Sequence, residues 1–272
     1  MIEPKSPLSP ESQDDEVRRQ SRRMTRRSFA VGAVAVVAGL AGHRWLVTRE
    51  TEDGIPWPLR KVLGFNERLS RVAFRESHLA PSFPPESALA AEDMRVNGMI
   101  GMGGAFDPAT WKLSVQNDRG PVQRFALNDV RSVARSEMIV QLKCIEGWSE
   151  VFSWAGASLG EFMRRYRLGT RSGAAPDPKG NPADLYAYVA LETPDGGYYV
   201  GLDMASALQP QTLLCYEMGG EPLAPAHGAP LRLAIPVKYG IKNLKRIGRI
   251  RFTDERPRDY WTERGYDWYS GH

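Results

Sequence analysis

The sequence predicts an α+β protein built from short strands, a few short helices and long irregular loops. Apolar and β-branched runs such as residues 138–142 and 213–218 are typical of buried strands. Helical periodicity is clearest at residues 158–166, where Leu159, Phe162 and Met163 share one face. Glycine and proline divide the remainder into loops, and the sequence contains no internal repeat. These features indicate one large domain or two closely merged ones.

The composition allows a sizeable core and gives little support to a nucleic-acid partner. The chain has 272 residues, 42% of them hydrophobic, and a formal net charge of +4. That charge comes from the N-terminal segment, and the rest of the chain is near neutral. A pI of about 9.1 therefore does not indicate nucleic-acid binding. The arginines responsible are Arg18, Arg19, Arg22, Arg23, Arg26 and Arg27.

Residues 1–49 are expected to be a disordered N-terminus followed by a twin-arginine export leader. Residues 1–20 are polar and charged, which is typical of disorder. Paired arginines then precede an apolar run, 29–42, that is short for a transmembrane helix. No Ala-x-Ala cleavage site follows, so retention as a membrane anchor stays open, as does an internal helix without a targeting role. The expected location is the periplasm or the outer face of the cytoplasmic membrane.

The elements expected after the leader follow one another in a single domain. Residues 50–58 are expected to be a linker, residues 59–272 the domain, and residues 59–92 an extended loop because of their prolines. Strands are expected at 94–98, 111–116, 138–144, 185–191, 198–202, 213–218, 231–235 and 249–252. Helices are expected at 127–134, 158–166 and 204–208, and loops at 101–104 and 171–182.

Cys144 stands at the end of a predicted strand and just before a Gly-Trp corner. A thiol held at a strand tip can be presented to a ligand, and thiolates are good ligands for soft metals. A buried, inert core cysteine is the alternative that one cysteine by itself leaves open. The second cysteine, Cys215, could pair with it in an oxidising compartment. If Cys144 binds metal that pairing is excluded, and Cys215 is expected to be buried.

Two segments carry a family resemblance. Residues 144–149, Cys-Ile-Glu-Gly-Trp-Ser, resemble the metal-cysteine segment of the sulfite oxidase superfamily, whose members carry a molybdenum–pterin cofactor. Residues 213–223, continuing through 227–233 and 236–245, resemble the pterin-binding stretch of that family. The two segments occur in the family's order, about seventy residues apart. The resemblance covers roughly residues 63–266 and implies a sulfite-oxidase-type fold of mixed sheets, short helices and long loops.

The resemblance implies molybdenum–molybdopterin as cofactor, with the Cys144 thiolate as metal ligand. His227 stands where sulfite oxidases have His and the bacterial methionine-sulfoxide reductase branch has Asn. Tyr266 follows Trp261 by five residues, the spacing of a Trp–Tyr pair near the metal in sulfite oxidases, so its phenol is a candidate catalytic donor. An aromatic tail that only covers a seam is the alternative. The cofactor contacts that the resemblance implies are Asn66, Glu67, Thr193, His227, Arg232, Asn243, Leu244 and Lys245, besides Cys144.

Departures from the family pattern shape the expected activity. Phe65-Asn66-Glu67 takes the place of an anion-binding Arg-Asn-His segment, and a carboxylate facing the substrate would repel sulfite. The layout is similar to the exported, monomeric methionine-sulfoxide reductase branch. We therefore expect two-electron oxygen-atom transfer on a small, sulfoxide-type substrate, with electrons exchanged with a separate haem protein.

Three alternatives stay open at this point. One is a sulfite dehydrogenase, and another is a cofactor-free, membrane-anchored binding protein that keeps the fold. A nucleic-acid binder that uses the basic run 238–251 is disfavoured, because stacking aromatics are not interleaved with its charges.

Overall fold

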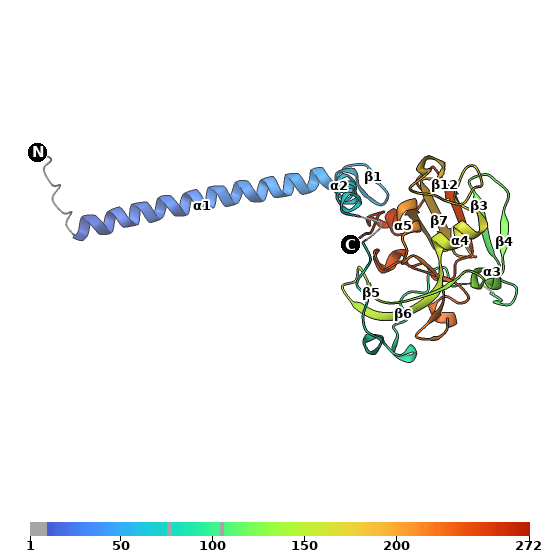
Figure 1. Cartoon of the computed structure of the whole chain (residues 1–272). Coiled ribbons are helices and arrows are strands. Elements are labelled where there is room, and N and C mark those ends of the chain that lie inside the picture. The colour runs from blue at the N-terminus through green and yellow to red at the C-terminus, as the bar shows by residue number, and fades with distance from the viewer. Residues whose placement is uncertain (1–9, 75–77, 104–105) are drawn as a thin grey trace, which may run out of the picture. The chain divides into compact units, whose positions relative to one another are not determined.

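The computed structural model describes residues 10–74, 78–103 and 106–272, and the chain divides into two compact units (Figure 1). The first unit is dominated by α1, Pro10–Val47. Residues Ser21–Val47 of α1 are long and apolar enough to cross a membrane, by length and composition. Disorder was expected over residues 1–20, but residues 10–20 are helical, because their Glu, Gln and Arg are good helix formers that extend an existing helix at little cost. Residues 1–9 lie outside the described part.

The region expected to be a linker and loop contains a hairpin and a helix. β1, Thr51–Glu52, pairs with β2, Ile55–Pro56, and α2 spans Trp57–Ala73. The loop predicted from residue 59 is therefore wrong up to residue 73. The prolines behind that prediction stand at 81, 84 and 85, and the proline within α2 is in its first turn, where a helix tolerates it.

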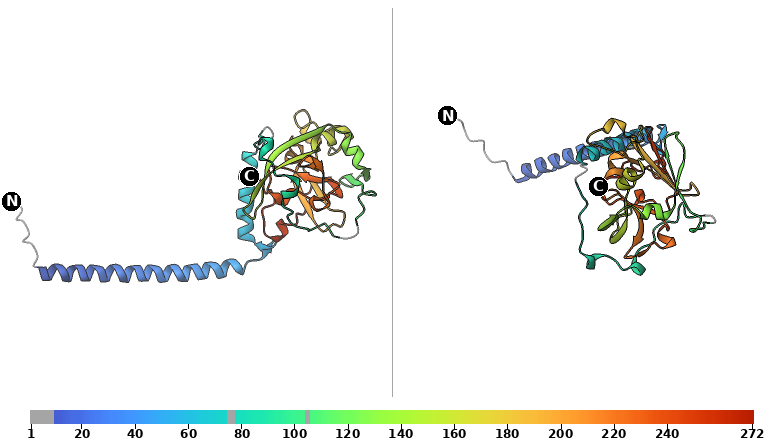
Figure 2. Two further views of the ribbon diagram at one scale, coloured as in Figure 1. Left: turned by 90° about the horizontal axis from the view of Figure 1, so that it is seen from below. Right: turned by 45° about the vertical axis from the view of Figure 1, so that its right-hand side comes forward.

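Residues 78–103 run largely as an extended segment (Figure 2). Only two single-turn helices interrupt its described residues, η1 at Pro85–Ser87 and η2 at Ala91–Asp93. The strand predicted at 94–98 is not formed. Gly98 has a left-handed φ of +66°, and its carbonyl accepts a hydrogen bond from Lys245 instead of a strand partner.

Two five-stranded sheets form the second unit. One has the order β10-β9-β6-β5, with β11 also paired to β9. Its strands are β5 (Arg135–Lys143), β6 (Ser149–Ser158), β9 (Leu213–Met218), β10 (Glu221–Pro222) and β11 (Arg232–Ala234). The other has the order β4-β3-β12-β7-β8, and only the β3–β12 pair in it is parallel. Its strands are β3 (Leu113–Asn117), β4 (Gln123–Phe125), β7 (Tyr188–Glu192), β8 (Tyr199–Asp203) and β12 (Arg249–Thr253).

Short helices complete this unit, and the α+β prediction is confirmed. They are α3 (Leu127–Arg131), α4 (Leu159–Tyr166), α5 (Met204–Leu208), η3 (Pro182–Asp184), η4 (Pro225–His227), η5 (Gly240–Lys242) and η6 (Thr262–Arg264). The other predicted strands and helices are confirmed, with ends that differ by up to three residues. Ser158 caps α4, because its hydroxyl accepts from the Glu161 N–H.

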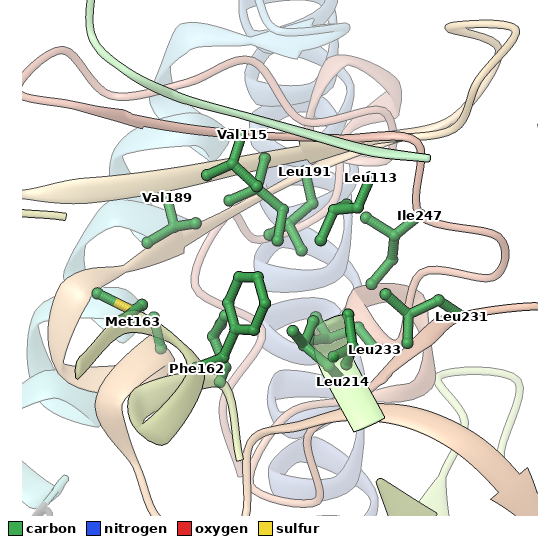
Figure 3. Packing of buried hydrophobic residues seen from close by; sticks show 14 of the residues in the cluster. Leu113, Val115, Phe162, Met163, Val189, Leu191, Leu214, Leu231, Leu233 and Ile247 are labelled. Atoms are coloured by element: carbon green, nitrogen blue, oxygen red, sulfur yellow. The ribbon is translucent and has the colours of Figure 1, made fainter. Parts of the chain in front are cut away.

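The main core lies between α4 and strands of both sheets. In Figure 3, side chains of β3 and β7 point toward Phe162 and Met163 of α4 and toward Leu214 of β9. A second, smaller cluster is built mainly from strands of the sheet that contains β5, β6, β9 and β11, and it includes Phe152 and Trp154 of β6. This second cluster forms one wall of the cavity described below.

The sequence did not predict β6, although it is the longest strand in either sheet. Its last four residues, Ala-Gly-Ala-Ser, have low β-propensity. Glycine is required at Gly156, since a Cβ there would lie 2.2 Å from the carbonyl oxygen of Leu214 on β9. The pairing of β6 with β9 also shifts register between Ala155 and Gly156.

Candidate active site

A cavity of about 310 Å³ opens where the end of β5, the 95–100 loop, the 227–245 segment and the C-terminal segment meet. Cys144 follows β5 directly and is 8% exposed. Its N–H donates to the Trp148 carbonyl (2.9 Å), and its carbonyl accepts from the Gly147 N–H (3.1 Å). Gly147 adopts a φ of +90°, which closes this turn and fixes the thiol at the cavity wall. Burial raises the pKa of the free thiol.

Residues 95–100, which include most of the strand predicted at 94–98, form a loop beside the thiol. Asn97 donates from Nδ2 to Cys144 Sγ over 3.7 Å, and the neighbouring Arg95 stacks on the Trp148 ring at 4.8 Å. Arg95 also pairs with Glu150 at 3.4 Å. Sequence reasoning missed Asn97 because no motif marks it. Asn97 lies 47 residues before Cys144 in the sequence, and only the path of the loop brings the two side chains together.

Arg232 is a buried cation without an acidic partner among the residues that the structure describes. It is 5% exposed, and its two terminal nitrogens donate to the carbonyls of His227 (3.0 Å) and Asn243 (3.4 Å). Its guanidinium lies 4.5 Å above the Trp154 ring, and its Nε has no hydrogen-bond partner. Burial lowers its pKa to about 10. An unneutralised guanidinium of this kind favours an anionic ligand.

Two more predicted contacts lie beside Arg232. His227 is 8% exposed, and burial, reinforced by Arg232 and Lys245, lowers its pKa to about 4, so the ring is neutral at pH 7. Lys245 donates from Nζ to the carbonyls of Gly98 and Ala226, each at 3.0 Å. Burial, and then repulsion by Arg232, lowers the Lys245 pKa to about 8.

Asn243 holds this part of the cavity in shape. Its Oδ1 accepts from the Ile235 N–H (2.8 Å), and its Nδ2 donates to the Tyr239 carbonyl (3.2 Å). Leu244, by contrast, is fully buried in the main core and does not line the cavity.

The aromatic pair of the C-terminal segment lies at the rim of the same cavity. Trp261 and Tyr266 pack edge to face, with ring centroids 5.3 Å apart, and Tyr266 is 40% exposed. Asp259 fixes the turn between them, because its Oδ1 accepts from both the N–H and the hydroxyl of Thr262, at 3.1 Å each. Asp259 in turn pairs with buried Lys242 at 2.5 Å.

Besides Leu244, the structure places three further predicted contacts outside the cavity. Glu67 lies on α2, where it pairs with Arg71 (3.0 Å) and Arg256 (2.8 Å), and Asn66 beside it is exposed. Thr193 is buried, donates to Asp195 (2.6 Å) and packs against the Gly101 backbone. Because Glu67 does not face the cavity, the expectation that it repels an anionic substrate has no basis in the structure.

The basic run 238–251 is not the solvated face that a charge run usually forms. Lys238 and Lys242 are 2% and 1% exposed, and Lys245 points into the cavity. Arg249 pairs with Glu192 at 2.8 Å. The second cysteine, Cys215, is fully buried with its pKa raised to about 12, as expected for an inert thiol.

The donor set fits a particular kind of cofactor. Cys144 offers one soft sulfur ligand, and the described residues contain no group of three or more His, Cys, Asp or Glu that could hold a metal alone. Arg232 and Lys245 offer two cations for a phosphate, and Trp154 offers a flat apolar wall. This donor set fits a metal that is carried by an anionic cofactor, with Cys144 as its protein ligand.

Comparison with known proteins identifies the family and the cofactor. Residues 101–261 match the family described as the oxidoreductase molybdopterin binding domain, and the chain belongs to this family. The protein is a molybdopterin-dependent oxidoreductase of the sulfite oxidase superfamily, with molybdenum–molybdopterin as cofactor. The predictions of family, enzyme class and cofactor are confirmed.

Three known proteins are similar to this chain. A candidate protein-methionine-sulfoxide reductase subunit, YedZ1 of Azospira oryzae, is 27% identical over 92% of this chain and 87% of its own. The protein-methionine-sulfoxide reductase catalytic subunit MsrP of Xanthomonas campestris pv. campestris is 34% identical over 56% of this chain and 47% of its own. The chain thus spans about half the length of the MsrP relatives. The sulfane dehydrogenase SoxCD of Paracoccus pantotrophus has a TM-score of 0.45 and 16% identity over 56% of this chain and 40% of its own.

Proposed function

We propose that this protein is an exported oxidoreductase that catalyses two-electron oxygen-atom transfer on a sulfoxide-type small molecule. The observation that carries the proposal is the convergence of Cys144, His227, Arg232, Asn243 and Lys245 on one cavity from separate parts of the sequence. The names of the MsrP relatives support a sulfoxide as the substrate class.

In this proposal some side chains of the cavity bind the cofactor and others face the substrate. The molybdenum–pterin group supplies the redox chemistry when bound. Cys144 would be its protein sulfur ligand, with Asn97 donating a hydrogen bond to that sulfur. Arg232 and Lys245 would hold the phosphate, and neutral His227 would offer a ring nitrogen without added charge. Tyr266, at the rim, would donate its phenol proton in a hydrogen bond to the substrate oxygen.

The setting that we propose is the outer face of the cytoplasmic membrane. Arg26 and Arg27 precede the apolar part of α1, which is typical of twin-arginine export, and Ser21–Val47 could remain as an anchor. Electrons would pass to or from a separate haem protein. We propose a monomer, without nucleic-acid binding.

Sulfite is a second candidate substrate, favoured by one observation. His227 stands in the cavity at the position where sulfite oxidases have His. Beside it lie Arg232 and Lys245, which have no acidic partner among the described residues and would attract an anion. The ion-paired position of Glu67 removes the repulsion that was expected to disfavour sulfite.

Metal analysis and turnover test the proposal together. Molybdenum per chain is measured by elemental mass spectrometry on protein from the exported fraction, beside a Cys144→Ser variant. We expect a value near one for the wild type and near zero for the variant, because hydroxyl is a poor ligand for a soft metal. Turnover of methyl sulfoxides with a reduced dye, but not of sulfite with an oxidised one, supports the reductase. Sulfite oxidation alone would refute the sulfoxide proposal, and wild-type protein without molybdenum would refute the cofactor site.

A further inference from the structure

Helix α2 is amphipathic, but it exposes an apolar face and turns polar side chains toward the domain, the reverse of an ordinary surface helix. Five of its apolar side chains recur at intervals of three and four residues and point away from the domain. The five are more than two-fifths exposed: Leu59 41%, Val62 56%, Phe65 58%, Leu69 61% and Val72 83%. We call this surface the outer stripe. Soluble proteins usually expose such side chains singly, so a contiguous stripe indicates a contact surface.

Polar side chains on the inner face attach α2 to the domain. Arg71 pairs with Asp203 and with Glu67, each at 3.0 Å. Arg60 donates to the main-chain carbonyls of Thr262 and Tyr266, each at 2.8 Å. These contacts fix the rotation of the helix about its axis, so the outer stripe cannot turn inward without breaking them.

The connection to α1 indicates what covers the outer stripe. Leu59 follows Val47, the end of the candidate membrane span, by twelve residues. A span in a bilayer would keep the start of α2 within a short chain length of the lipid surface. Basic side chains lie close to the stripe in sequence, with Arg44 and Arg49 before it and exposed Arg68 within α2. Arginines beside an apolar helical face favour an anionic lipid interface.

We propose that the outer stripe lies in the interfacial region of a phospholipid bilayer, so that α2 attaches the domain to the membrane beside the anchor. The proposal rests on the membrane anchor given under Proposed function and adds a second membrane contact. Because Arg60 joins α2 to the carbonyl of Tyr266, this attachment also fixes how the cavity rim faces the membrane.

Fluorescence of a label on one added cysteine tests the proposal on the full-length holoenzyme. NBD is placed at Phe65→Cys or Leu69→Cys in the stripe, and at Lys179→Cys in an exposed loop as the matched control. The labelled proteins are reconstituted at low protein-to-lipid ratio into vesicles of phosphatidylethanolamine and phosphatidylglycerol. Unsubstituted protein corrects for labelling of the two buried native cysteines. Flotation reports membrane association separately from the label.

We expect both stripe labels, but not the Lys179 label, to show a blue shift, a several-fold rise in emission and quenching by doxyl lipids. Flotation with water-like emission at the stripe would overturn the interfacial helix and leave the anchor intact. Failure to float would overturn both. A blue shift in detergent that grows with protein concentration, without lipid quenching, would assign the stripe to a second copy of the chain and overturn the proposal. A blue shift that appears only with a co-reconstituted haem protein would assign the stripe to that partner and overturn the proposal.

Discussion

Asp259→Ala should be among the most destabilising single changes in the domain. Asp259 and Lys242 form an ion pair whose side chains are both 1% exposed, at 2.5 Å. The carboxylate also accepts from the Gly201 N–H (3.1 Å) and from Thr262. Removing it leaves Lys242 charged and buried, with the Gly201 carbonyl (3.0 Å) and the Trp268 ring as remaining partners.

Breaking a buried ion pair from one side costs about 3–5 kcal/mol. For a domain of this size each kcal/mol lowers Tm by about 2–4 °C, so Tm should fall by about 6–20 °C. The loss should also loosen the turn that carries Trp261 and Tyr266, so it should reduce turnover of the folded fraction. Urea unfolding followed by circular dichroism, with thermal melts, measures the stability change.

The double variant Asp259→Ala with Lys242→Met is the control. It removes the stranded charge and fills its place with an apolar chain of similar length, so it should recover more than half of the lost stability. A single variant that loses less than about 1 kcal/mol, the range of an exposed pair, would refute the reasoning. So would a double variant as unstable as the single one.

Three further predictions follow from the core and the cavity. Gly156→Ala should lower Tm, since its Cβ would meet the Leu214 carbonyl oxygen at 2.2 Å, whereas Gly64→Ala, with open space around it, should not; equal Tm values would contradict this. In the cofactor-free protein, inorganic phosphate should raise Tm more at pH 7 than at pH 9, because the Lys245 cation is present below its pKa of about 8 and lost above it. Lys245→Met should abolish that difference, and a shift that persists in the variant would place the anion elsewhere. Since the His227 pKa is lowered to about 4, the unfolded chain takes up a proton before the folded one as pH falls from 6.5 to 4, and stability should decline over that window. His227→Asn should flatten the decline in urea midpoints, and an unchanged slope would show that other groups cause it.

Local patterns were enough for most of the strands and short helices. Period and turn residues placed β9 and α5 at their observed bounds, and the capping serine and apolar face of α4 were both recognisable. The errors have local causes too. Low β-propensity hid β6, and prolines beyond residue 80 hid the helical character of α2.

The cavity shows a similar division. Ordered motifs were enough to single out Cys144, His227, Arg232, Asn243 and Lys245, which the structure brings together. The same motifs also pointed to Asn66, Glu67 and Thr193, which lie elsewhere, because a motif match carries no information about which way a side chain points. Asn97 had no sequence signal at all.

The sequence by itself determined the fold class, the family and the cofactor, because these depend on residue types at short spacings along the chain. The tertiary structure alone decided burial and pairing, which depend on residues distant in sequence. Arg71 meets Asp203 across 132 residues, and that contact turns the apolar side of α2 outward. Arg232 loses contact with water only when β11 packs into the core, where it has no carboxylate partner among the described residues, and this burial favours an anionic ligand.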